Sequence, residues 1–362
     1  MVIMALDHTR DFFSKLRFPP EDLSRSTPFL FFTRWITHFC APSFFFLAGL
    51  GAALSLSRGK TKKSLSWFLF TRGLWLVFLE LTVLAFAWNF NFDFPRILNV
   101  IWALGWSMVI LSALVFLSEK VIAAIALIAI VGHNLLDKIT PASFGSLAPL
   151  WNVLHVPGLA SPDFIVAYPL IPWSAVMALG FALGRVYKWE PRERKRFLIT
   201  AGSVAVVAFL VLRGFNLYGN PQPWSPQSTA AMTVAAFLNT LKYPPSLHFL
   251  LMTLGPALIA LAFFERARGK AVDVISVYGK VPMFYFVLHI VVIHLLAYLF
   301  ALVQGGEGSF LGIDLSKYPE WYGTTLPGVY LAWLIVVALL YIPCRWYARV
   351  KSTGRYPLLS YL

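Results

Sequence analysis

Long apolar stretches alternate along the chain with short polar or charged segments. A helix needs about 20 mostly apolar residues to cross the hydrocarbon core of a membrane. Nine stretches approach that length and each predicts a transmembrane helix: Phe29–Ser57, Leu65–Trp88, Ile97–Leu117, Val121–Leu136, Phe164–Tyr187, Phe197–Leu212, Pro245–Phe264, Val281–Val303 and Pro327–Cys344.

Two further apolar pieces are too short to cross a membrane. The piece Ala230–Leu241 is compatible with an interfacial or re-entrant helix. The piece Met1–Leu6 runs directly into Asp7, so we interpret it as the outer half of a first helix that is truncated, with its start upstream of Met1. The prediction is therefore an all-α, polytopic membrane protein of about ten transmembrane helices, forming a single transmembrane domain over residues 1–362.

The basic residues between the predicted helices indicate an orientation. With the N-terminus inside, most lysines and arginines fall in cytoplasmic segments, among them the blocks Arg58–Lys63 and Arg185–Arg196. Cytoplasmic loops of membrane proteins carry such an excess of lysine and arginine. We therefore expect both the N-terminus and the C-terminus on the cytoplasmic side.

Composition supports the membrane class. Hydrophobic residues make up 59% of the 362 residues and charged residues 13%, against about 45–50% and about 25% in soluble domains. The net charge of +14 does not indicate nucleic-acid binding, because the basic residues form short blocks between apolar stretches, where they suit membrane lipid headgroups. The two cysteines, Cys40 and Cys344, can build neither a disulfide framework nor a metal cluster, so no metal is expected.

The histidines all fall in the middle or the outer half of the predicted topology. They are His8, His38, His133, His155, His248, His289 and His294. This asymmetry favours proton-transfer chemistry toward the outer face, because the imidazole pKa suits that task. The alternative is a structural role in hydrogen bonds between helices, which we favour for His133, His155 and His294.

His8 stands out because charged residues surround it in the sequence. Asp7 and Asp11 are four residues apart and share a helix face next to His8, with Arg10 between them. A carboxylate near an imidazole fixes its tautomer and raises its basicity, as a general base requires. The sequence therefore marks His8, with Asp7 and Asp11, as candidate catalytic residues.

A second polar pair lies in the next helix. Arg34 and His38 are four residues apart and should share a face, and Pro42 predicts a kink just after them. Such a kink frees backbone groups, which must line a cavity or be buried in protein. The alternative for Arg34 is a structural ion pair with Asp7 or Asp11.

Polar residues elsewhere in the helices suggest a binding site for an anion. They also include a further candidate histidine. Arg72 and Lys280 lie toward the cytoplasm and could contact phosphate, although snorkelling to the interface or solvation would also explain them. His289 is the most deeply placed histidine and needs a partner, for which Tyr285 is a candidate at i−4. No motif of a soluble enzyme class is present.

Six segments, in order along nearly the whole chain, resemble relatives of heparan-alpha-glucosaminide N-acetyltransferase, a family of transmembrane acyltransferases with bacterial members. They are Met1–Phe13, Thr33–Gly49, Asn99–Gly105, Tyr168–Gly184, Lys242–Gly255 and Gly279–Ile290. The resemblance implies transfer of an acetyl or other acyl group from cytoplasmic acyl-CoA to an extracytoplasmic sugar, glycan or lipid-linked sugar, in the bacterial inner membrane and without a metal. A homodimer is left open.

The resemblance implies roles for these residues. A histidine among His8, His38 and His289 would deprotonate the acceptor or carry the acyl group, while Arg72, Lys280 and Arg34 would bind acyl-CoA. Attack on the thioester also needs a group that stabilises the oxyanion, and Arg34 or His38 could serve. One departure concerns the family pattern, which has its catalytic histidine after the first helix, whereas Phe12–Arg34 contains none. The alternative function is a transporter or lipid-handling protein that uses the same polar cavity.

Overall fold

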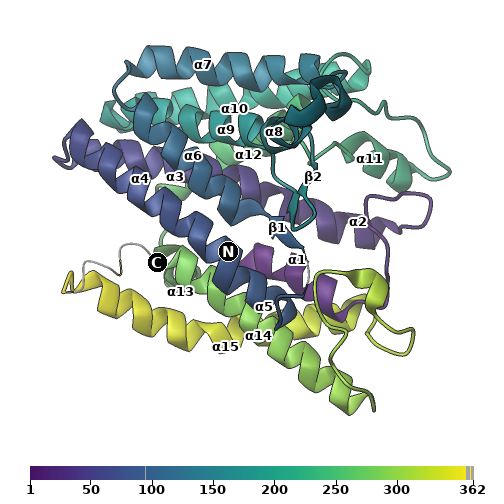
Figure 1. Ribbon diagram of the computed structural model, residues 1–362. Coiled ribbons are helices and arrows are strands. Elements are labelled where there is room, and N and C mark those ends of the chain that lie inside the picture. The colour runs from purple at the N-terminus through teal and green to yellow at the C-terminus, as the bar shows by residue number, and fades with distance from the viewer. Residues whose placement is uncertain (94, 356–358, 360–362) are drawn as a thin grey trace. The chain divides into compact units, whose positions relative to one another are not determined.

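The computed structural model describes residues 1–93, 95–355 and 359, and most of them are helical (Figure 1). Contacts divide the chain into two compact units. The first unit comprises Met1–Cys40, Thr82–Phe94 and Ala267–Leu362, and the second comprises Ala41–Leu81 and Pro95–Arg266. The expectation of a single domain over residues 1–362 stays a prediction.

The first unit gathers helices from both ends of the chain. Helix α1 packs against α14 and α15, and the short α5 packs against α14. The indole of Trp333 in α15 donates a hydrogen bond to the carbonyl of Val2 (2.9 Å), which fixes the start of α1. The helices are α1 (Val2–Phe13), α2 (Pro28–Trp35), η1 (Ile36–Phe39), α5 (Ala85–Asn89), α13 (Lys270–Lys280), α14 (Pro282–Val303), η6 (Leu315–Lys317) and α15 (Leu326–Ser352).

The second unit is a bundle in which α4 packs on α6, α6 and α7 on α9, and α10 on α12. A π-helical turn, η2 (Glu80–Leu84), leads from α4 toward α5. The other helices are α3 (Cys40–Ser57), α4 (Lys62–Leu79), α6 (Val100–Leu114), α7 (Glu119–Gly132), η3 (His133–Leu136), η4 (Pro141–Leu147), α8 (Ala148–Leu154), α9 (Leu170–Leu183), η5 (Gly184–Lys188), α10 (Pro191–Gly214), α11 (Ala230–Leu238) and α12 (Leu247–Phe264).

Polar capping residues explain where several helices begin. The first backbone N–H groups of a helix have no partner within it, and a side-chain oxygen just before the helix can accept from one of them. Thr27 caps α2 in this way, with Pro28 in the first turn, and Ser118 caps α7. Asn99, Thr61 and Ser246 cap α6, α4 and α12.

A small sheet lies in the second unit, and two of its three strands, β1 and β3, fall at the starts of stretches that were predicted as helix. Strand β3 (Phe164–Val166) pairs in parallel with β1 (Arg96–Leu98) and antiparallel with β2 (Gly158–Ser161). The predicted spans beginning at Ile97 and Phe164 were therefore wrong at their starts. Both stretches are apolar, but Asn99 caps a helix only from Val100, and Pro169 keeps the preceding residue extended.

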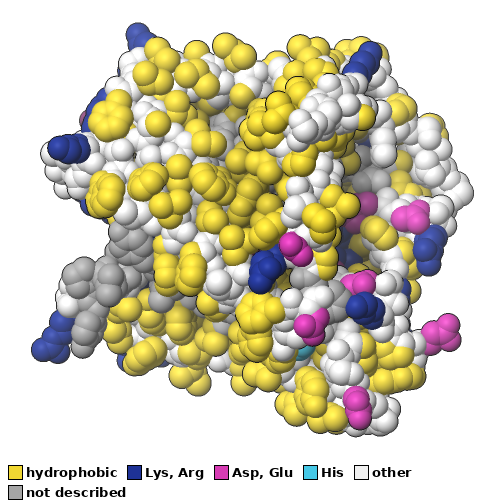
Figure 2. Space-filling view, viewed as in Figure 1, with side chains coloured by type: hydrophobic (Ala, Val, Ile, Leu, Met, Phe, Trp, Pro, Cys, Tyr) yellow, Lys and Arg dark blue, Asp and Glu magenta, His cyan; other side chains and the backbone are white. Residues whose placement is uncertain are grey.

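Eight helical segments among the described residues are long and apolar enough to cross a membrane, which confirms an all-α polytopic membrane protein. They are Pro28–Ser57, Lys62–Asn89, Glu119–Leu136, Leu170–Lys188, Pro191–Gly214, Leu247–Phe264, Pro282–Val303 and Leu326–Ser352. Hydrophobic side chains cover much of the viewed surface (Figure 2), as contact with lipid requires. Helix α6 is shorter and α1 has 12 residues, so the count of ten and the orientation stay predictions.

The expected kink lies one turn earlier than predicted. Pro42 falls inside the first turn of α3, and the irregular stretch is η1, which separates α2 from α3. Proline has no N–H, so the carbonyl four residues before it loses its helical partner and the preceding turn tightens. Arg34 therefore lies in α2 and His38 in η1, instead of on one regular helix.

Candidate active site

Two histidines from opposite ends of the chain meet in the first unit. His8 Nδ1 lies 2.7 Å from His289 Nε2, and the two rings are stacked with centroids 4.9 Å apart. His8 comes from the middle of α1 and is partly buried, whereas His289 comes from α14 and is fully buried. The contact pairs two of the three histidines that were predicted as catalytic.

A backbone carbonyl determines which nitrogen of His289 carries the proton. His289 Nδ1 lies 3.0 Å from the carbonyl oxygen of Tyr285, which can only accept a hydrogen bond. Neutral His289 therefore presents the lone pair of Nε2 to His8, and His8 donates through its Nδ1–H. In neutral His8 the proton acceptor is then Nε2. The prediction that Tyr285 is a partner of His289 is confirmed, through its backbone and a stacked ring at 5.3 Å.

Aromatic side chains surround the histidine pair. The ring of His8 meets Trp88 edge-on with centroids 5.0 Å apart, and Phe286 at 6.1 Å. Trp88 belongs to α5 and is buried. Such rings exclude water, and exclusion of water strengthens electrostatic interactions at a reacting centre. The contact of Trp88 with His8 could not be predicted, because nothing in the sequence separates a tryptophan near a site from a tryptophan in a core.

A network of ion pairs involves the residues of α1 that flank His8. Arg10 Nη2 contacts Asp7 Oδ1 at 3.0 Å and Asp11 Oδ1 at 2.7 Å. Asp7 and Arg10 are both buried. Both carboxylates that were predicted as catalytic, Asp7 and Asp11, are therefore bound to Arg10, which lies between them in the sequence.

Arg34 and Glu21 extend this network to His38. The Arg34 guanidinium contacts Asp7 through Nη1 and Glu21 Oε1 through Nε at 2.7 Å. His38 Nε2 lies 3.5 Å from the same Glu21 oxygen. Burial opposes ionisation of Glu21, but Arg34 and His38 outweigh it and hold the pKa of this carboxyl well below its ordinary value. The ion pair of Arg34 with Asp7, predicted as its structural alternative, is confirmed.

The family can now be assigned. A model of the catalytic region of heparan-alpha-glucosaminide N-acetyltransferase matches residues 1–218, more than half of the chain. The chain belongs to the heparan-alpha-glucosaminide N-acetyltransferase family. It is therefore a membrane-bound enzyme of the acetyltransferase type. Searches of curated proteins and of solved structures found no match.

The match covers only part of the candidate site of this acetyltransferase. Asp7, His8 and Asp11 lie inside the matched residues, as do Arg34 and His38. His289 lies outside them and joins the site through the fold of the first unit.

The other histidines have contacts that fit structural roles or a separate cluster. His294 Nδ1 lies 3.1 Å from the carbonyl of Ala87, and its ring stacks on Phe90. His248 Nε2 lies 3.1 Å from the carbonyl of Tyr218. His155 Nε2 lies 3.0 Å from Asp137 in the second unit.

The basic residues predicted to bind acyl-CoA in this acetyltransferase lie on separate elements. Arg72 belongs to α4 in the second unit, and Lys280 is the exposed last residue of α13 in the first unit. Pro282 occupies the first turn of α14. Arg34 lies instead among carboxylates, so its binding of acyl-CoA stays a prediction.

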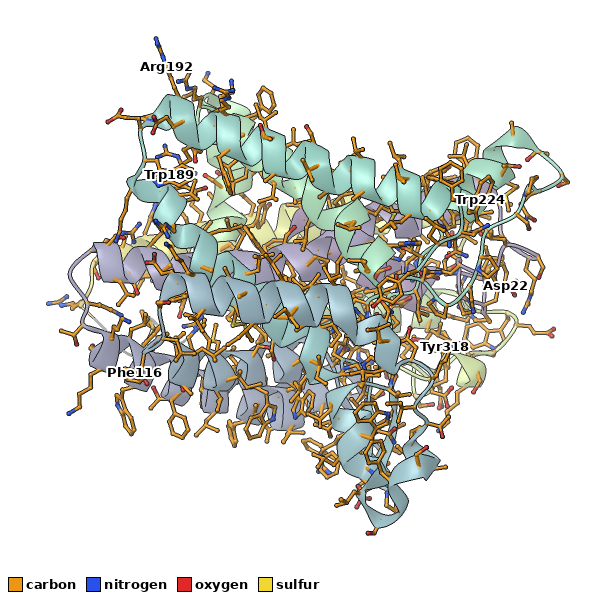
Figure 3. All side chains as sticks on the ribbon, turned by 90° about the horizontal axis from the view of Figure 1, so that it is seen from above. Asp22, Phe116, Trp189, Arg192, Trp224 and Tyr318 are labelled. Carbon is orange, nitrogen blue, oxygen red and sulfur yellow. The ribbon has the colours of Figure 1, made fainter. Side chains whose placement is uncertain are left out.

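A basic hollow in the second unit was not foreseen. It has a volume of about 460 Å³ at the start of α10, and its lining includes Arg192, Lys195, Arg196 and Arg266. Figure 3 places Trp189 and Arg192 at one end of α10 and Trp224 near the other. The basic block Arg185–Arg196 contributes most of these cations, but a block of basic residues in the sequence does not indicate a hollow.

Proposed function

We propose that this acetyltransferase moves an acetyl or other acyl group from cytoplasmic acyl-CoA to a sugar hydroxyl or amine on the outer side of a bacterial inner membrane. The observation that carries the proposal is the 2.7 Å contact between His8 and His289. An oriented imidazole pair in an aromatic setting suits a general base, which accelerates such reactions by about 10²–10⁴-fold.

His8 is the base in this proposal and His289 positions it. His289 accepts a hydrogen bond from Nδ1–H of His8. Nε2 of His8 is then the atom that takes the proton from the hydroxyl or amine of the sugar. The acceptor oxygen or nitrogen then attacks the thioester carbon. The new acyl bond forms, the carbon–sulfur bond breaks, and the proton passes from His8 to the departing CoA thiolate.

In this proposal Asp7 and Asp11 position α1 and do not accept a proton from the substrate. Arg10 binds both carboxylates, and Arg34 binds Asp7. These ion pairs fix the turns of α1 on either side of His8, and such positioning is a large part of catalysis. His38 is linked to the same network through Glu21.

Cations on the predicted cytoplasmic side would hold the phosphates of acyl-CoA. Arg72 and Lys280 are the candidates from the sequence, and the basic hollow adds Arg192, Lys195, Arg196 and Arg266. Arginine pairs well with phosphate because its planar donors match phosphate oxygens. Arg196→Ala with Arg266→Ala should raise KM for acyl-CoA more than it lowers kcat if the hollow holds the phosphates.

The test measures CoA release from labelled acetyl-CoA by the purified full-length protein in lipid vesicles, with a panel of sugar acceptors. His8→Ala and His289→Ala should each lower kcat by at least about 100-fold. His294→Gln is the matched control, because it removes another buried histidine of α14 and should keep turnover. Thermal unfolding checks that each variant is folded.

Full turnover in folded His8→Ala and His289→Ala would remove the proposed site. Binding and translocation of a substrate without CoA release would favour the transporter.

A further inference from the structure

Three potential metal ligands meet in the second unit, away from the acetyl-transfer residues in sequence. His133 begins η3 at the end of α7, Asp137 follows η3, and His155 directly follows α8. Each offers one ligand atom, and these atoms all lie within 4.8 Å of one another. His155 Nε2 is already 3.0 Å from Asp137 Oδ1. Two imidazoles and a carboxylate thus converge from two helix ends.

The imidazoles are buried and leave ring nitrogens unsatisfied. His133 is 2% exposed and His155 is fully buried. Among the described residues, neither ring nitrogen of His133 has a hydrogen-bond partner, and Nδ1 of His155 has none. Buried polar atoms are normally satisfied, and exceptions often mark an ion or water that completes the site. Both ring nitrogens of His133 are therefore available to bind a ligand.

We propose that His133, Asp137 and His155 bind one divalent transition-metal ion of the zinc type. Zinc takes nitrogen and carboxylate ligands at about 2.0–2.2 Å, so two ligands of a tetrahedral ion lie roughly 3.3 Å apart. The distance of 3.0 Å between His155 and Asp137 fits this spacing, and a small shift of His133 completes it. Three protein ligands leave a fourth position for water.

The surroundings of the cluster supply the support that metal ligands need. Asn134 Nδ2 donates to the second oxygen of Asp137 at 2.8 Å and orients the carboxylate. The ring of Trp151 packs against His155 with centroids 5.3 Å apart. Metal binding also needs a tautomer shift at His155, which moves its proton from Nε2 to Nδ1. The two cysteines predict no metal cluster, but this ligand set requires no thiolate.

The metal would tie two segments together, and a hydrogen bond joins a third to them. It joins the end of α7 to the end of α8, on either side of the loop that contains η4. Asn134 also accepts a hydrogen bond from Leu247 N (2.9 Å) at the start of α12. The site therefore closes the long loop between α7 and β2 against two transmembrane helices.

The test uses the full-length protein, purified in detergent with a tag that contains no histidine and stripped with a chelator. Cobalt(II) is titrated first, because its visible absorption reports coordination by nitrogen and oxygen ligands. Zinc(II) is then added in competition, and bound metal is counted by mass spectrometry of the elements. We expect about one ion per chain and a higher thermal midpoint when the metal is bound.

Variants with matched controls connect the ion to this cluster. Asn134→Ala should weaken zinc binding by about 10–100-fold, as loss of a supporting hydrogen bond does, and His133→Gln by at least 100-fold. The control His248→Gln removes a buried histidine outside the cluster and should keep the affinity. Asp137→Asn should lose the metal, whereas Asp163→Asn, an exposed carboxylate before β3, should keep it.

Two results would overturn the proposal. One is the absence of a cobalt spectrum and of stoichiometric zinc in the folded wild-type protein, which requires no variant to fold. The other is equal affinity in His133→Gln and His248→Gln. Both measure metal binding and not acetyl transfer, so they are independent of the proposed function.

Discussion

Glu21 links the stability of the first unit to pH. Its pKa in the folded protein lies below the ordinary value of 4.5, because the charges of Arg34 and His38 outweigh burial. A carboxyl with a depressed pKa stabilises the fold fully above its ordinary pKa, and this contribution disappears as the pH falls toward the folded value. The free energy of unfolding should therefore fall as the pH drops below about 4.5, measured by denaturant titration in detergent.

Glu21→Gln should lower the free energy of unfolding near neutral pH and flatten this acid dependence. Glu320→Gln is the control, since Glu320 is an exposed glutamate of the same unit. An unchanged acid slope in Glu21→Gln would show that the ion pair with Arg34 contributes nothing to the dependence.

Tyr285 offers a hydroxyl that could stabilise the oxyanion of the thioester. Its ring stacks on His289, it is fully buried, and its Oη has no hydrogen-bond partner among the described residues. If the hydroxyl donates to the developing oxyanion, Tyr285→Phe should lower kcat by about 100-fold or more, with little change in KM for acyl-CoA. The measurement is steady-state CoA release.

Measurements of thermal stability distinguish a catalytic role of the Tyr285 hydroxyl from a role in packing. Removal of an unsatisfied buried hydroxyl should leave the thermal midpoint unchanged or raised. Tyr278→Phe is the contrasting variant, because Tyr278 donates to the carbonyl of Val337 at 2.9 Å and should lose stability without losing kcat. A normal kcat in Tyr285→Phe would mean that another group stabilises the oxyanion, for which Arg34 is a candidate.

Single residues were predictable where charge or burial marks them. His8 could be found because Asp7, Arg10 and Asp11 surround it within one turn, and His289 because it is polar in the middle of an apolar helix. Their contact could not be found, since 281 residues separate them and local periodicity carries no long-range information. Glu21 was missed because a glutamate in a loop usually faces solvent.

Helix α3 contains two glycines whose surroundings differ. A Cβ at Gly49 would collide with the backbone carbonyl of Met177 in α9, whereas a Cβ at Gly51 would meet nothing within 4 Å. Small residues let membrane helices approach closely. Gly49→Ala should therefore destabilise the second unit by about 1–3 kcal/mol, while Gly51→Ala should be neutral or stabilising by up to about 1 kcal/mol.

The thermal midpoints of the two variants, measured in the same detergent, test this difference. The pair shares a helix and a substitution, so helix propensity cancels in the comparison. Equal midpoints would mean that α3 and α9 are not held at the distance that Gly49 permits.

At the scale of elements, apolar length predicted the membrane helices, because hydrocarbon thickness fixes the length that is needed. Val281–Val303 and Pro245–Phe264 were placed within two residues of α14 and α12. Apolar length predicts the wrong helix start where an apolar stretch is not one helix. At Phe164 a strand precedes the helix, and hydropathy cannot distinguish a short buried strand from the first turn of a span.

At the scale of the whole molecule, the family match and the apolar helices agree on a membrane acetyltransferase. Transfer across a membrane needs a donor side and an acceptor side. The orientation of the chain therefore decides whether acyl-CoA can reach the site, since CoA is a cytoplasmic metabolite in the proposed function.

The two ends of α10 differ in the basic charge that they expose. The predicted cytoplasmic end carries the block Arg185–Arg196, with Arg192 exposed. At the other end, Arg213 is 2% exposed and donates to backbone carbonyls, including those of Phe237 and Gln222. Lys242 in the same predicted outer segment is also buried. The exposed basic charge at the two ends of α10 therefore follows the predicted orientation, which stays a prediction.

Cysteine labelling in intact cells tests this orientation. In a background with Cys40→Ala and Cys344→Ala, single cysteines replace two exposed residues, Arg192 and Ser225. Figure 3 places Arg192 at one end of α10 and Trp224, the neighbour of Ser225 in the sequence, near the other. A membrane-impermeant maleimide should label Ser225→Cys in intact cells and Arg192→Cys only after permeabilisation. The reverse pattern would put the basic block outside. The cytoplasmic acyl-CoA of the proposed mechanism would then have no access to the cations expected to bind it.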